Sequence, residues 1–150
     1  MAEAIELSLR NVREGKGGPF AAIVVKDGKV IARGVNRVTA TNDPTAHAEI
    51  VAIREACQAL GTFQLDGCEI YSSCEPCPMC LAAIYWARPA RVFFGNTKED
   101  AAAAGFDDSL IYNEITRPLG ERKIPLRCMM RDEAKVAFKE WATSPLKVEY

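Results

Sequence analysis

Two short groups of residues in the chain have the types and spacing of a metal-dependent catalytic site. The first is the triplet His-Ala-Glu at 47–49, which contains the one histidine of the sequence, and the second is Pro-Cys-Pro-Met-Cys at 76–80. One histidine and two cysteines supply the nitrogen and sulfur ligands that zinc prefers, and three protein ligands leave a fourth position open for water. We therefore predict one Zn²⁺ per chain, held by His47, Cys77 and Cys80.

Glu49, two residues after the histidine, is the candidate proton-transfer residue. Zinc lowers the pKa of a water that it binds to about 7, so that hydroxide is available at neutral pH. Glu49 would take the proton of that water and pass it to a departing amine. A His-x-Glu triplet followed by Pro-Cys-x-x-Cys is the pattern of zinc-dependent nucleobase deaminases. We therefore predict a hydrolytic deaminase in which Glu49 is catalytic.

Other interpretations of the cysteines stay open on the sequence alone. A Cys-x-x-Cys pair that opens a helix after a strand also occurs in thioredoxin-like redox sites. Cys74 could join Cys77, Cys80 and His47 in a closed four-ligand zinc site, or the cysteines could hold an iron–sulfur cluster. A non-catalytic zinc-binding module would need such a fourth ligand and would have no use for Glu49. We expect Cys74 to be structural or to lie behind the ligands.

The elements that must position these residues follow from hydrophobic periodicity and turn residues. In one helix, over 3–13, Ile5, Leu9 and Val12 recur at helical spacing. The other expected helices span 45–60, 76–87, 107–116 and 132–141, and the expected strands span 20–25, 30–34, 68–73, 91–95 and 126–130. The pair Asp-Gly at 27–28 suits a type I′ hairpin turn between the first two strands.

The second helix carries the histidine and the third carries the cysteines. Asp43 and the proline after it should begin the second helix, and Gly61 should end it. The first turns of these two helices would then hold all the proposed ligands. Strands that alternate with helices indicate an α/β fold, with a single five-stranded sheet and helices on both faces. We expect one domain over 1–150, with a tail over about 143–150.

Composition and charge restrict the class of protein only loosely. The chain is 49% hydrophobic and 26% charged, with a net charge of -1, which is typical of one folded domain without a strong affinity for nucleic acid. It contains no apolar run long enough to span a membrane and no basic leader followed by an apolar segment. We therefore expect a cytoplasmic protein with reduced cysteines and with no nucleic-acid or membrane partner.

Beyond the two metal motifs, the sequence resembles the cytidine-deaminase-like superfamily and, within it, the short zinc-dependent guanine deaminases. Four blocks carry the resemblance, at 17–20, 42–49, 73–80 and 105–109. The resemblance implies a three-layer α/β/α fold with a mixed sheet, a homodimer, and hydrolysis of guanine to xanthine and ammonia. Domain exchange is a low-cost route to dimers, so the C-terminal tails could be exchanged between the subunits.

The same resemblance implies a set of substrate-binding residues, namely Phe20, Asn36, Ala48, Trp86, Asp107, Asp108 and Tyr150. In this assignment Asn36 and Asp108 hydrogen-bond the purine edge, and the two rings of Phe20 and Trp86 enclose the base. The backbone of Ala48 meets a carbonyl group, and Tyr150 closes the pocket. Taken by themselves, Phe20 and Trp86 fit core positions equally well, and Asp107 and Asp108 fit the first turn of a helix.

The substrate rests on this resemblance, because guanosine and related purine or triazine amines present a similar pattern of donors and acceptors. A tRNA adenosine deaminase would use the same zinc chemistry and is the main alternative. Such an enzyme should carry a broad basic surface for the phosphates. The near-neutral charge and the acidic pair at 107–108 count against it.

Overall fold

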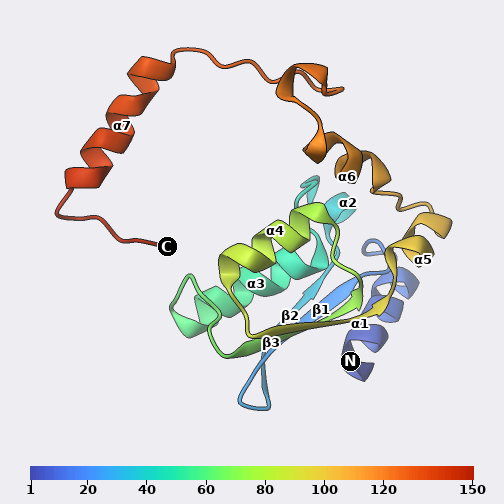
Figure 1. Cartoon of the computed structure of the whole chain (residues 1–150). Helices are drawn as coiled ribbons and strands as arrows, with labels where there is room; N and C mark the ends of the chain where they lie inside the picture. The colour runs from blue at the N-terminus through green and yellow to red at the C-terminus, as the bar shows by residue number, and fades with distance from the viewer. The chain divides into compact units, whose positions relative to one another are not determined.

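The computed structural model describes residues 1–150, which form two compact units, Met1–Asp108 and Ser109–Tyr150 (Figure 1). The first unit contains α1 (Ala2–Arg13), β1 (Ala21–Lys26), β2 (Lys29–Val35), α2 (Val38–Thr41), α3 (Ala48–Leu60), β3 (Cys68–Cys74), α4 (Pro78–Ala87), β4 (Arg91–Asn96) and α5 (Lys98–Ala103). The second unit contains α6 (Ser109–Thr116), the 3-10 helix η1 (Leu119–Glu121) and α7 (Arg131–Thr143). The expected helices and the first four expected strands are present, with shifted ends.

The first unit is built on a mixed sheet with the strand order β2-β1-β3-β4. Strand β1 runs antiparallel to both β2 and β3, whereas β3 and β4 are parallel. The loop between β1 and β2 has two residues, Asp27 and Gly28, with φ angles of 50° and 73°. Both angles are positive, as a type I′ turn requires, so the predicted hairpin is confirmed.

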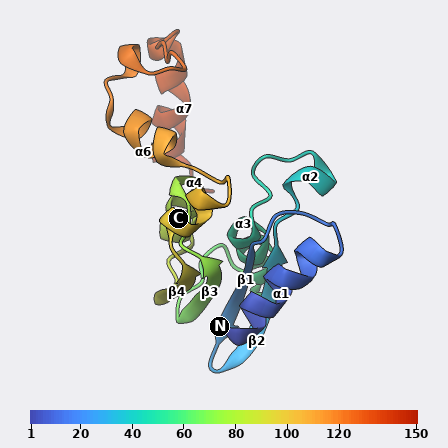
Figure 2. The same ribbon diagram turned by 90° about the vertical axis from the view of Figure 1, so that its right-hand side faces the viewer.

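Helices cover both faces of this sheet, and successive side chains of β1, which point to opposite faces, pack against different helices. Ala22 and Val24 belong to the core cluster that includes residues of α3 and α4. Ala21 and Ile23 belong to a second cluster, which includes residues of α1. Figure 2 shows α1 and α3 on opposite sides of the strands. The prediction of an α/β fold with a mixed sheet and helices on both faces is confirmed.

The prediction of a fifth strand is wrong, because the sheet has four strands. Residues 126–130 form no helix or strand, and all five side chains are exposed. The segment is apolar except for Arg127, but it contains none of the β-branched or aromatic residues that favour a strand. A strand also needs a neighbouring strand that pairs with its backbone groups, and that partner is a property of the tertiary structure.

Helix α1 forms where its apolar spacing predicts it, but it buries a different face. Ile5, Leu9 and Val12 are 44%, 48% and 50% exposed. The buried residues of the helix are Ala4, Leu7, Ser8 and Asn11. The two polar members of that set are satisfied by hydrogen bonds, since the hydroxyl of Ser8 donates to the carbonyl of Ile5 and the amide of Asn11 donates to two loop carbonyls.

In the second unit, α7 confirms the predicted closing helix and begins one residue earlier and ends two residues later than expected. Tyr150, the last residue, is 70% exposed. None of the helices in the structure combines the length and the apolar character needed to cross a membrane.

Candidate metal centre and active site

Helices α3 and α4 both begin one residue after a proposed metal ligand. The N-cap residue of α3 is His47 and that of α4 is Cys77, so our expected starts at 45 and 76 were too early. Asp43 does not cap α3, because its Oδ1 accepts hydrogen bonds from the backbone and the hydroxyl of Thr45, at 2.8 and 2.7 Å. This local turn competes with helix formation and delays the start of α3.

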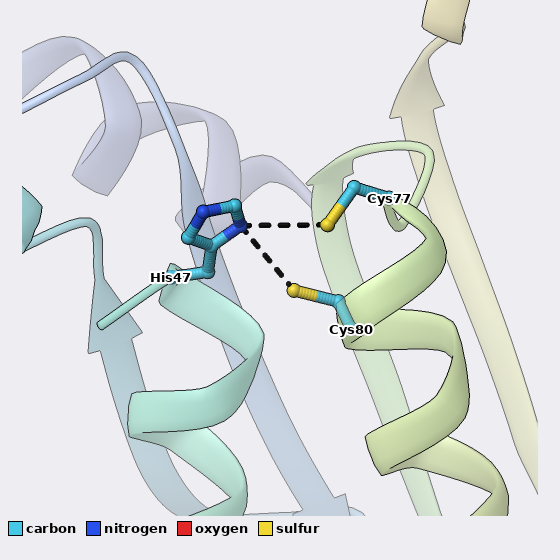
Figure 3. A group of neighbouring side chains, drawn as sticks. All are labelled: His47, Cys77 and Cys80. Carbon is cyan, nitrogen blue, oxygen red and sulfur yellow. Dashed lines mark hydrogen bonds between the residues drawn. The ribbon is translucent and has the colours of Figure 1, made fainter. Parts of the chain in front are cut away.

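Neither N-cap side chain is used to cap its helix. His47 and Cys77 have extended backbone conformations, and neither makes a side-chain capping hydrogen bond. The imidazole and the thiol are therefore available for other bonds. Figure 3 shows them pointing toward each other from α3 and α4, with Cys80 one turn further along α4. The positive end of a helix dipole favours a thiolate at this position.

The distances among the three side chains fit a tetrahedral zinc ion. Nδ1 of His47 lies 3.5 Å from Sγ of Cys77 and 3.5 Å from Sγ of Cys80. Ordinary zinc–sulfur and zinc–nitrogen bonds at a tetrahedral angle place nitrogen and sulfur about 3.5 Å apart. All three ligand atoms lie within 4.8 Å of one another. The histidine and the two cysteines can therefore hold one ion and leave a fourth position open.

The protonation of the cysteines also suits a metal site. The pKa of Cys77 is lowered to about 4, first because the thiol of Cys80 donates a hydrogen bond to its sulfur and then because of the bond with His47. The hydrogen bond between His47 and Cys77 raises the pKa of His47. The hydrogen bond that Cys80 donates to Cys77, together with burial, raises the pKa of Cys80. The cluster thus already contains one thiolate, which is the form that binds zinc.

Glu49 lies in the first turn of α3 and is 6% exposed. Its Oε2 is 3.4 Å from Sγ of Cys80, and its Oε1 accepts a hydrogen bond of 3.1 Å from the hydroxyl of Ser72. Burial raises the pKa of Glu49, which moves the carboxyl toward the range in which it can both take and give a proton near neutral pH. The structure therefore places the carboxyl group of Glu49 beside the proposed metal ligand Cys80.

Cys74 faces away from the three ligands. Its thiol points at the backbone carbonyl of Thr97, 3.6 Å away, and it is not part of the cluster of possible ligands. Burial raises the pKa of Cys74 to about 11, so the thiol stays protonated. This geometry favours an open three-ligand site over a closed site with four ligands.

Asn36, after β2, is held in a single orientation by two backbone groups. The side chain is 8% exposed, and its Oδ1 accepts hydrogen bonds from the N–H groups of Gly18 and Val38, both at 3.3 Å. Because two donors face Oδ1, the NH₂ group is left as the donating side of the amide. Asn36 can therefore present a hydrogen-bond donor to a ligand.

The segment that holds Asp107 and Asp108 is joined to the loop before β1 through two aromatic rings. Phe20 and Phe106 make an edge-to-face contact, with ring centroids 4.9 Å apart. Asp108 is partly buried, and both this burial and the negative charge of Cys77 raise the pKa of its carboxyl. The proposed base-binding residues Phe20 and Asp108 are thus brought into one region with Cys77, whereas Asp107 is exposed.

The other proposed substrate contacts are placed as follows. Ala48 is fully buried as the first residue of α3, where backbone N–H groups have no partner within the helix. Trp86 is 64% exposed on α4 and, six residues after Cys80, stands about 9 Å further along the helix axis. Tyr150 belongs to the second unit. The roles of these three residues stay predictions.

Three residues that the sequence did not single out contact this region. They are Asn11, whose amide binds the loop carbonyls of Gly18 and Asn36, Ser72 beside Glu49, and Phe106 beside Phe20. Phe106 lay within the block at 105–109 and could have been chosen as an aromatic neighbour. Nothing in the sequence distinguished Asn11 or Ser72 from ordinary surface residues of a helix and a strand.

The chain is similar to known deaminases in sequence and in structure. Residues 1–96 match the family model of the cytidine and deoxycytidylate deaminase zinc-binding region. The chain is 54% identical to the guanine deaminase of Bacillus subtilis over 150 residues, which is 100% of this chain and 96% of that protein. The X-ray structure of guanine deaminase from Bacillus subtilis superimposes with a TM-score of 0.97, over 99% of this chain and 95% of that one.

Two further relatives differ in how much of the chain they match. A tRNA-specific adenosine deaminase of Agrobacterium fabrum is 49% identical over 94 residues, which is 61% of this chain and 62% of that protein. A solved mutant structure in complex with 8-azaguanine is 35% identical, with a TM-score of 0.68, and the match covers 95% of this chain and 82% of that one.

Proposed function

Because the chain belongs to the cytidine and deoxycytidylate deaminase family, we propose that it catalyses the zinc-dependent hydrolysis of guanine to xanthine and ammonia. One observation carries the choice of substrate. The similarity to the Bacillus subtilis guanine deaminase extends over 150 residues, whereas the similarity to the tRNA-specific adenosine deaminase covers 94. The relative that binds 8-azaguanine, a purine analogue, also matches 95% of the chain.

The proposed metal ligands are His47, Cys77 and Cys80, with one Zn²⁺ per chain. Nitrogen and sulfur atoms spaced 3.5 Å apart support this assignment. When bound, zinc supplies a hydroxide nucleophile near neutral pH. The ligands come from the N-termini of α3 and α4, two helices that pack in one core cluster and contact each other.

Glu49 is the proposed catalytic acid and base. It takes a proton from the attacking water and delivers it to the exocyclic amine, which leaves as ammonia. The ring carbon exchanges its bond to nitrogen for a bond to oxygen, so guanine and water become xanthine and ammonia. The raised pKa of Glu49 and its position beside Cys80 support both proton steps.

The proposed base-binding residues divide the recognition of guanine among donors, acceptors and apolar faces. Asn36 donates from its NH₂ group to an acceptor of the ring, and Asp108, when ionised, accepts from ring N–H or amine groups. The backbone N–H of Ala48 donates to the carbonyl of the base. Phe20 packs against the ring, where its edge-to-face contact with Phe106 fixes its orientation.

The remaining proposed contacts involve Trp86 and Asp107 in the first unit and Tyr150 in the second. Trp86 offers a second aromatic face to the base and Asp107 a further carboxylate, and Tyr150, at the end of the tail over about 143–150, closes the site. We further propose that the protein is a cytoplasmic homodimer of single-domain chains, in which the tail closes the site of its own subunit or that of its partner.

Ammonia release from a panel of substrates tests the proposed activity. The panel contains guanine, guanosine, cytosine, cytidine, adenine and a tRNA anticodon stem-loop, each incubated with zinc-loaded protein at the same concentration. We expect turnover of guanine to exceed that of every other compound by at least about a hundredfold, because a site built to pair with polar groups rejects bases that leave those groups unpaired. Preferred turnover of the stem-loop would replace guanine deamination with tRNA editing.

A further inference from the structure

The sheet beneath the proposed active site carries two adjacent buried serines with different partners. Ser72 and Ser73, on β3, are 2% and 3% exposed. The hydroxyl of Ser72 donates a hydrogen bond of 3.1 Å to Oε1 of Glu49. The hydroxyl of Ser73 instead accepts a bond of 3.0 Å from the backbone N–H of Ala21 on β1. One serine contacts the proposed acid–base residue, and the other stabilises the sheet.

We propose that Ser72 is a positioning residue for Glu49. Its hydroxyl holds Oε1 at the sheet and thereby keeps Oε2 on the side of the metal ligands, where it lies 3.4 Å from Sγ of Cys80. This inference rests on the proposed function, because it assigns to Ser72 a part in the proton transfer by Glu49.

Two properties of the carboxyl group explain why it needs such a partner. The terminal torsion of a glutamate side chain is broad, so helix α3 fixes the position of the group better than its rotation. A proton-transfer group must also stand within hydrogen-bond reach of the atom that it serves, and a displacement of about 1 Å can cost two orders of magnitude in rate. A donor fixed in a strand supplies the missing constraint on rotation.

The hydroxyl of Ser72 is buried and donates its hydrogen bond to Glu49. The side chain of this serine shares the α3 and α4 face of the sheet with the fully buried Ile70, and Ser72 itself is 2% exposed. The bond to Glu49 is the hydrogen bond that its hydroxyl donates. Removal of the hydroxyl would leave Oε1 of a buried carboxyl group without that donor.

Replacement of Ser72 separates positioning from stability. Ser72→Ala should lower kcat for guanine by about tenfold or more, the effect of one lost hydrogen bond to a charged group, while KM stays within about twofold. Zinc affinity, measured by competition with a chromogenic chelator, should not change. Ser72→Thr keeps a hydroxyl and should restore at least about a third of the wild-type kcat.

Ser73→Ala is the matched control, because it removes a buried hydroxyl one residue away that does not contact Glu49. It should lower the thermal midpoint, since the N–H of Ala21 loses its acceptor, and should leave kcat per bound zinc unchanged. If Ser72→Ala and Ser73→Ala reduce kcat equally, or if Ser72→Thr is as slow as Ser72→Ala, the proposal is overturned.

A double-mutant cycle with Glu49→Gln decides whether Ser72 acts through Glu49. In that background Ser72→Ala should change the residual rate by less than about twofold, because the group that Ser72 positions no longer transfers protons. If the loss of kcat in the double variant equals the product of the losses in Ser72→Ala and Glu49→Gln, the proposal is overturned. The wild-type rate in the same assay tests the proposed function separately: if another base is the preferred substrate, the cycle is run on that base. Wild-type protein inactive on all of them would overturn both proposals.

Discussion

Gly34 of β2 lies directly against the backbone of Ala48, the first residue of α3. A Cβ atom at position 34 would overlap the carbonyl oxygen of Ala48 and would lie 2.5 Å from the backbone nitrogen of Ala52. The absence of a side chain therefore allows α3 to approach the sheet closely. The helix start that depends on this contact carries both His47 and Glu49.

Substitution of Gly34 by alanine should damage the fold and the metal site together. The new methyl group can be accommodated only if the N-terminus of α3 moves away from the sheet, and we expect a loss of about 1 to 3 kcal/mol in the free energy of unfolding. Zinc affinity should fall as well. Denaturant unfolding and chelator competition measure the two effects. Gly120→Ala is the control, since a Cβ there meets nothing within 4 Å. A Gly34→Ala protein with unchanged stability and affinity would contradict the contact.

Zinc content should depend on three residues and not on a fourth. Purified wild-type protein should contain about one zinc per chain, and His47→Ala, Cys77→Ala and Cys80→Ala should each lose most of it. Cys74→Ser should retain the metal, because the thiol of Cys74 faces the carbonyl of Thr97. Elemental analysis of dialysed samples gives the answer. Loss of zinc from Cys74→Ser would indicate a closed four-ligand site and would remove the open position on which the chemistry depends.

Replacement of Glu49 by glutamine should separate metal binding from catalysis. The amide has nearly the same shape as the carboxyl but cannot take up and release the proton. We therefore expect zinc content to stay near one per chain while kcat for guanine falls by about 10² to 10⁴. Steady-state kinetics on metal-analysed samples test this. A Glu49→Gln enzyme with near-normal turnover would assign the proton transfer to another group.

Asn11 of α1 should influence the binding of guanine although it is not itself a proposed substrate contact. Its amide donates to the backbone carbonyls of Gly18 and Asn36, at 2.9 and 3.0 Å, and so joins the loop before β1 to the backbone of Asn36, whose side chain is a proposed base contact. Asn11→Asp has the same shape but no donor, and we expect KM for guanine to rise by about tenfold with zinc content unchanged.

A control for Asn11 must destabilise α1 without touching the loop. Leu7→Ala meets this need, because Leu7 is 8% exposed in the core cluster beneath α1. Leu7→Ala should lower the thermal midpoint by an amount comparable to the decrease in Asn11→Asp. It should leave KM for guanine within about twofold of the wild-type value. Equal increases of KM in Leu7→Ala and Asn11→Asp would show that KM rises because α1 packs less well, and would contradict a specific role for the hydrogen bonds of Asn11.

Deletion of residues 148–150 tests the proposed lid. If the tail closes the site, the truncated protein should keep its thermal midpoint and zinc content, because Val148 and Tyr150 are 58% and 70% exposed, but should lose at least about tenfold in guanine turnover. Full activity of the truncated protein would rule out a lid.

Mixing of two inactive variants identifies the subunit that the tail serves. A dimer of one Glu49→Gln chain and one truncated chain would contain one site with its glutamate at position 49 and one intact tail, on different chains. Recovery of activity, once subunit exchange is demonstrated with labelled chains, would assign the tail to the partner's site. No recovery would assign it to the tail's own subunit.

The chemistry-bearing residues of this protein could be selected from the sequence because their signal is local. His47 and Glu49 lie within one turn of a helix, as do Cys77 and Cys80, and ligand types and spacing alone indicate zinc. The hairpin at Asp27 and Gly28 was equally predictable, since a two-residue turn with positive φ angles strongly restricts which residues can occupy it.

The tertiary structure decided which faces are buried, which segments pair and what lies behind the catalytic groups. Helical spacing at Ile5, Leu9 and Val12 predicted a helix but not its buried side. The face that packs on the sheet is instead the one that carries Ala4, Leu7, Ser8 and Asn11. Residues 126–130 are mostly apolar, but they pair with no strand of the sheet. The contact of Ser72 with Glu49 joins positions 23 residues apart, and it arises only when α3 packs on the sheet that contains β3. Local sequence encodes ligand type and turn conformation, whereas burial and pairing depend on distant parts of the chain.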